Sequence, residues 1–81
     1  MNVAIGGLLA DRARYAAATI EIACLGARET DPRRVRAFTQ EIYERHGFKR
    51  PMEYLGLVSE LEQDAEVQRT VAEGEGRCRP K

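Results

Sequence analysis

Histidine and cysteine are scarce in this chain, which has a single histidine, His46, and two cysteines, Cys24 and Cys78. A zinc site needs closely spaced pairs of such ligands, and small secreted domains usually carry four or more cysteines. Here one cysteine lies in an apolar stretch and the other far away, near the end of the sequence. We therefore expect no metal site and two reduced thiols, which predicts a cytoplasmic protein.

The residue combinations that catalysis requires are also missing. His46 is the only histidine that could act as a base, and Cys24 is the only well-placed nucleophile. No motif brings a base, an orienting group and an oxyanion hole together. The glycines at 6–7 and 74–76 do not follow a strand, so they do not predict a phosphate-binding loop. We expect a protein that is not an enzyme, with no catalytic residue and no cofactor.

Long uninterrupted apolar runs are absent, because Asp11, Arg12 and Arg14 interrupt the apolar segment near the N-terminus. No basic segment precedes that run, and a membrane span needs about 20 apolar residues. We expect neither a signal peptide nor a membrane span, and no membrane partner. The abundance of arginine and alanine is what GC-rich codons would produce, which favours a bacterial, phage or plasmid source.

The sequence does contain helical periodicity over most of its length. Hydrophobic residues make up 43% and charged residues 32%, a composition that predicts folding into a globular domain. Predicted helices cover 8–28, 32–46, 51–57 and 60–73, all within one domain (1–73), and 74–81 is predicted to be a flexible tail. Because no segment alternates in the manner of a strand, the fold class is all-α, a small three- or four-helix bundle.

Several residues mark helix ends. Asp31 followed by Pro32 is a strong start signal, and Gly47 is typical of a residue just beyond a helix C-terminus. Gly56 favours a break in the last region, and Ser59 with Glu62 has the spacing of a capping box. One kinked helix over 51–73 is the alternative to two.

The first predicted helix has apolar residues on two sides. Leu9, Ala13, Ala16, Ile20, Ala23 and Ala27 form one stripe, and Leu8, Tyr15, Ala18, Ile22 and Leu25 form another, roughly opposite. The small residues Ala16 and Ala23 predict a close helix–helix contact. Because the remaining helices are expected to cover only one side well, the second stripe predicts a homodimer in which Leu8, Tyr15 and Ile22 contact a second copy. The alternative is a monomer in which the last region splits at Gly56 and wraps around the first helix.

Charge is balanced overall but segregated along the chain. Thirteen basic and thirteen acidic residues give a net charge of zero, yet residues 1–52 carry a basic excess and residues 53–75 an acidic one. The acidic last helix packing beside the arginine-bearing second helix would explain this pattern. The alternative is a dipolar surface that orients a charged partner.

Two basic groups are candidate partner-binding sites. Arg33, Arg34 and Arg36 lie at the start of a helix, where cations are mildly unfavourable, and Arg45, Lys49 and Arg50 surround the next turn. The function expected from these features is a small protein-binding module that acts as a regulator, inhibitor or adaptor. A nucleic-acid-binding domain using the arginine cluster is the alternative. A helix-turn-helix protein is disfavoured, because the helix after the turn would bring carboxylates toward phosphates.

Overall fold

The computed structural model describes the backbone of residues 3–78 and the side chains of residues 11–78. It contains four helices: α1 (Val3–Arg28), α2 (Pro32–Arg45), α3 (Pro51–Leu61) and α4 (Ala65–Cys78). No strand occurs within that backbone. The predicted all-α bundle is therefore confirmed.

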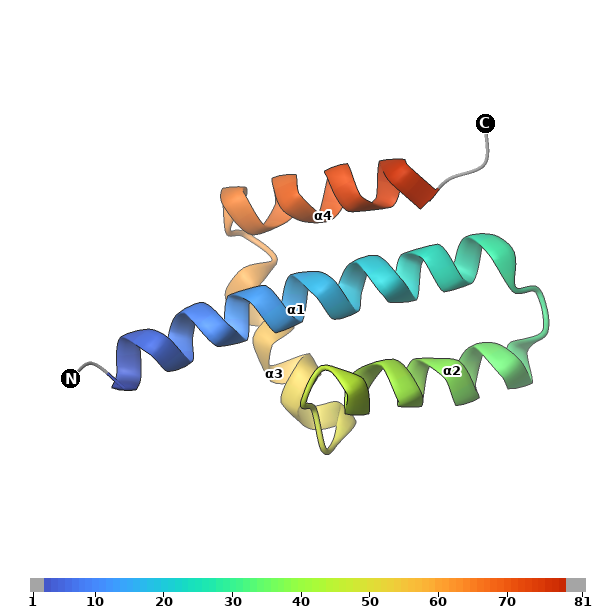
Figure 1. The fold of residues 1–81 in the computed structure, drawn as a ribbon, viewed down its shortest axis with the longest axis horizontal. Coiled ribbons are helices and arrows are strands. Elements are labelled where there is room, and N and C mark those ends of the chain that lie inside the picture. The colour runs from blue at the N-terminus through green and yellow to red at the C-terminus, as the bar shows by residue number, and fades with distance from the viewer. Residues whose placement is uncertain (1–2, 79–81) are drawn as a thin grey trace.

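Helix α1 is the central element of the bundle (Figure 1). It lies between α2, which runs along one side, and α4, which runs along the other, while α3 connects the two sides by crossing α1. The core consequently consists of two hydrophobic clusters on opposite sides of α1, instead of one central cluster.

The cluster between α1 and α4 combines short side chains of these two helices with Tyr15 of α1 and Leu61 of α3. Ala16 of α1 and Val67 and Val71 of α4 are buried there, and Ile20 packs against them. The N-terminus of α4 is fixed by Asp64, which accepts a hydrogen bond from the Val67 N–H at 3.1 Å and forms an ion pair with Arg12 of α1. One carboxylate thus caps α4 and ties it to α1.

The cluster between α1, α2 and α3 has Phe48 at its centre. This residue lies in the α2–α3 turn, is fully buried, and contacts Tyr54 edge to face with ring centroids 5.6 Å apart. The guanidinium of Arg14 lies 4.5 Å from the centre of the Phe48 ring. Tyr54 also stacks on Tyr15 and hydrogen-bonds Thr19 at 2.7 Å. Burial raises the pKa of Tyr54, a change that the Thr19 hydrogen bond partly opposes.

Helices of the chain itself pack on both sides of α1, which overturns the reasoning behind the predicted dimer. Tyr15 is only 5% exposed, and Ile22 packs against the cluster around Phe48. The side chain of Leu8 lies outside the described residues. Because Tyr54 of α3 stacks on Tyr15 and α4 packs on the same cluster, Tyr15 is not available to a second copy. Ala16 is buried against α4 as predicted, whereas Ala23 is only partly buried.

The last two helices differ from the predicted boundaries. The break lies at residues 62–64 and not near Gly56, since Asp64 caps the following helix and Ser59 bonds only the carbonyl of Gly56. Helix α4 also extends to Cys78. The predicted flexible tail began at residue 74, so this prediction is wrong for residues 74–78. Residues 79–81 of the predicted tail lie outside the described part. Contacts with α1 stabilise the additional turn.

At Gly74, α4 lies close to the side chain of Ile20 on α1. A Cβ atom there would lie 2.7 Å from Cγ1 and 2.9 Å from Cγ2 of Ile20, whose branched side chain has few alternative rotamers. We expect Gly74→Ala to lower the free energy of unfolding by about 1 to 3 kcal/mol through overpacking. Gly76→Ala is the matched control, because nothing lies within 4 Å of its Cβ position.

Urea denaturation measures both glycine variants. The control should be as stable as the parent or more stable by up to about 1 kcal/mol, since alanine favours the helix. Equal stabilisation by both substitutions would show that α4 and α1 are not in close contact at Gly74.

Candidate functional site

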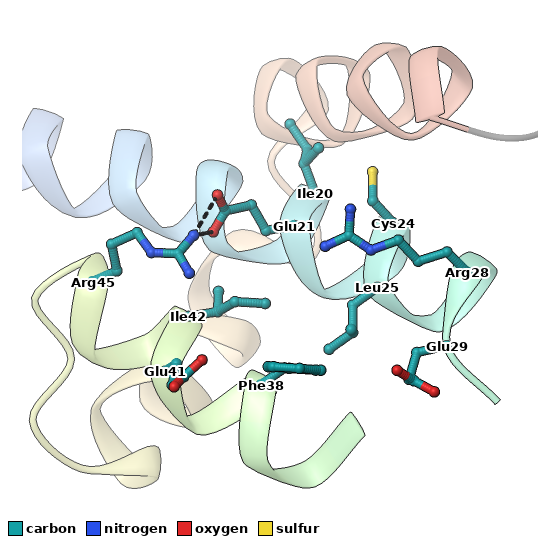
Figure 2. Close-up of a pocket in the computed structure, with 10 residues that line it drawn as sticks. All are labelled: Ile20, Glu21, Cys24, Leu25, Arg28, Glu29, Phe38, Glu41, Ile42 and Arg45. Carbon is teal, nitrogen blue, oxygen red and sulfur yellow. Dashed lines mark hydrogen bonds and ion pairs between the residues drawn. The ribbon is translucent and has the colours of Figure 1, made fainter. Parts of the chain in front are cut away.

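A cleft of about 390 Å³ lies between α1 and α2. In Figure 2, Leu25 of α1 and Ile42 of α2 point toward one another, and Phe38 lies beside them. Leu25 and Ile42 are buried, whereas Phe38 is 41% exposed. The cleft therefore has an apolar floor and an aromatic ring that remains accessible to solvent.

One end of the cleft is fixed by a charged network. Arg45 donates to both carboxylate oxygens of Glu21 at 3.0 Å, and His46 Nε2 lies 2.8 Å from the same carboxylate. These contacts join the C-terminal end of α2 to the middle of α1. Arg45, a predicted partner-binding residue, thus has a structural contact within the chain.

The rest of the cleft is lined by charged side chains without ion pairs. Arg28, Glu29 and Glu41 line it, and no ion pair involves them within the described side chains. Figure 2 shows the carboxylates of Glu29 and Glu41 on either side of the Phe38 ring. The cleft thus combines an apolar floor with charges of both signs, which can form new pairs with a ligand.

Cys24 lines the cleft and forms a disulfide with Cys78, which overturns the prediction of two reduced thiols. The last turn of α4 lies beside α1 and brings the two Cα atoms to 5.6 Å, inside the range that a disulfide needs. The two cysteines are 54 positions apart in sequence, yet the fold brings them together, so their separation did not indicate whether they pair. The Cys24 sulfur is bonded to another sulfur, and His46 contacts Glu21, so these two candidates do not form a nucleophile–base pair.

The six predicted cationic residues form two separate groups. Arg33, Arg34 and Arg36 are exposed at the N-terminal end of α2, with Asp31 accepting the Arg33 N–H at 2.9 Å. Lys49 and Arg50 are exposed in the α2–α3 turn, close to Arg45. The 14 residues of α2 separate the groups by about 20 Å. They do not form one continuous patch.

The glutamates of α4 do not neutralise the arginines of α2, because α1 lies between these two helices (Figure 1). Among the side chains of residues 11–78, no ion pair involves Arg33, Arg34 or Arg36. Of the two explanations for the charge pattern, packing of the acidic helix beside the basic one is wrong.

Sequence reasoning missed the cleft residues Phe38, Arg28 and Glu41. The helical spacing of Val35, Phe38 and Ile42, which puts them on one face of α2, was the available signal for Phe38. Its exposure depends on the spacing between α1 and α2, which no pattern within one helix contains.

The chain is a small all-α helical bundle. No protein-family model, curated protein or solved structure matches it. Within the described part of the chain, no helix is both long and apolar enough to cross a membrane.

Proposed function

We propose that this protein is a small, non-enzymatic protein-binding module that acts as a regulator, inhibitor or adaptor and binds its partner at the α1–α2 cleft. The observation that carries the proposal is Phe38, a large aromatic residue that is 41% exposed beside the apolar floor of the cleft. Aromatic anchors beside apolar pockets account for much of the binding energy in protein interfaces.

The cleft is suited to an apolar side chain of the partner. Its volume of about 390 Å³ is near the lower end of the range for ligand pockets. An inserted side chain would contact Phe38, Leu25 and Ile42, while Arg28 and Glu41 pair with charges around it. The exposed Arg33, Arg34 and Arg36 at the N-terminal end of α2 support a role for charge in orienting the partner and in setting its association rate.

Substitution of Phe38 tests the proposal once a partner has been captured with the immobilised chain from the native host and identified by mass spectrometry. We expect Phe38→Ala to weaken binding to that protein about 30-fold, the equivalent of about 2 kcal/mol. Met52→Ala is the matched control, because Met52 is 72% exposed on α3 and does not line the cleft. Isothermal titration calorimetry measures both affinities.

Unchanged affinity of Phe38→Ala would exclude the cleft as the binding site.

The triple variant R33Q/R34Q/R36Q should fold normally and bind more weakly, mainly through a slower association rate that depends on salt. If this variant binds as the parent does, these arginines form only a solvated surface.

A nucleic-acid-binding function is the second candidate, and the exposed Arg33, Arg34 and Arg36 are the observation that favours it. Such binding should strengthen as salt concentration falls and weaken in the triple variant. A titration against random-sequence DNA distinguishes the two functions, because the absence of binding at low salt would eliminate this candidate.

A further inference from the structure

Helix α3 has an inner face that builds the core and an outer face that nothing covers in the monomer. Tyr54, Leu57, Val58 and Leu61 pack inward against the two clusters. On the outer side, Met52 is 72% exposed and Leu55 is 53% exposed, one helical turn apart. Two large apolar side chains are therefore adjacent on the surface of an 11-residue helix.

The charges at the two ends of α3 have opposite signs. Lys49 and Arg50 precede the helix, whereas Glu60 and Glu62 lie at its C-terminal end, and all four are exposed. None of their side chains takes part in an ion pair within residues 11–78. The α3 surface is thus apolar in the middle, basic at one end and acidic at the other.

Gly56 lies near the centre of this surface. A Cβ atom at Gly56 would meet nothing within 4 Å, so no contact inside the chain requires glycine here. Glycine within a helix costs about 0.5 to 1 kcal/mol relative to alanine. On an exposed apolar face, its absence of a side chain allows another helix to approach closely.

We propose that α3 is a self-association surface, on which the α3 helices of two copies pair antiparallel about a twofold axis. An antiparallel pairing places the basic end of each helix beside the acidic end of the other, so the surface is complementary to itself. With the axis between Leu55 and Gly56, Leu55 lies level with Gly56 of the second copy. The same register places Lys49 level with Glu62 of the second copy.

A second copy of the chain on this surface explains three features of α3 together. The apolar residues are buried by the second copy, the glycine admits its Leu55, and the end charges become paired. Glu53 also lies on α3 and is exposed, but its carboxylate accepts the Lys49 backbone N–H at 3.2 Å. A surface of an anionic membrane fits less well, because Glu60 and Glu62 would be repelled by it.

The proposed α3–α3 interface is small, so the dimer that it forms has a low affinity. An 11-residue helix is about 16 Å long, and a stable interface usually buries about 1,200 to 2,000 Å² in total. The dimer is therefore weak, with half-dissociation at high micromolar concentration. Because α3 does not line the cleft, this inference is independent of the proposed function.

The charge pattern allows a decisive test by sedimentation equilibrium of the full chain from micromolar to millimolar concentration. The parent should shift from the 9.1 kDa monomer toward a dimer. Variant K49E/R50E carries acidic residues at both ends of α3, and variant E60K/E62K carries basic residues at both ends. Each alone should dimerise at least about tenfold more weakly, whereas an equimolar mixture should form a heterodimer as strong as the parent dimer.

A parent that stays at 9.1 kDa at every concentration would overturn the proposal, as would a mixture that does not regain association. A monomeric parent that co-sediments with phosphatidylserine vesicles would reassign this surface to a membrane. Gly56→Ala provides a second readout, since it should raise the melting temperature while weakening the dimer. Undiminished dimerisation of Gly56→Ala would contradict the close approach of the two helices.

Discussion

Replacing Cys24 and Cys78 together with serine is expected to lower the free energy of unfolding by about 4 kcal/mol. The disulfide closes a loop between residues 54 positions apart, and loop-closure entropy gives this magnitude for a loop of that length. The effect is large beside the total stability of a small domain, about 5 to 15 kcal/mol. Urea denaturation of the oxidised parent and of C24S/C78S measures it.

Reduction of the parent with dithiothreitol provides the matched control for this variant. The reduced parent should lose the same stability, because it lacks the bond but retains both residues. Mass spectrometry of the untreated protein should show a mass two hydrogens below that of the reduced chain. Equal stability of the oxidised and reduced parent would show that the cross-link does not constrain the unfolded chain.

Loss of the disulfide should also destabilise one part of the structure, the last turn of α4, more than the rest. Helix α4 contacts α1 through the short side chains of Val67 and Val71 and through Gly74, so the cross-link at Cys78 holds its last turn in place. Hydrogen exchange in C24S/C78S should accelerate most in this turn, which lies at the low-stability end of the structure once the bond is gone.

Phe48→Ala is expected to lower the free energy of unfolding by about 3 to 5 kcal/mol. The Phe48 ring is fully buried, and its removal would leave a cavity among Tyr43, Tyr54 and Leu25. The cation–π contact from Arg14 would be lost as well. Because α2 and α3 both pack on this residue, the cavity cannot close without moving a helix.

Phe38→Ala is the matched control for Phe48→Ala, because it deletes the same side chain from a position that is 41% exposed. We expect it to cost less than about 1 kcal/mol, in keeping with a surface substitution. Thermal and urea denaturation of the two variants should therefore differ strongly. Similar losses would show that Phe38 belongs to the core, which would weaken the case for the cleft.

The sequence alone determined that the chain is helical and where several helices begin and end. Asp31 and Pro32 start α2, and Gly47, with φ of 84°, follows its end, as predicted. These signals depend on groups within about one turn of each other, so they operate without knowledge of the tertiary structure. The two apolar stripes of α1 were also visible, because helical periodicity is a local property.

Only the tertiary structure decided what covers each stripe and which distant residues meet. The break at residues 62–64 sends α4 back along the free side of α1, which buries Tyr15 and places Cys78 beside Cys24. The spacing between α1 and α2 leaves Phe38 exposed, and Met52 and Leu55 of α3 are exposed as well. These outcomes depend on how the helices are placed relative to one another, and periodicity within a helix contains no information about that placement.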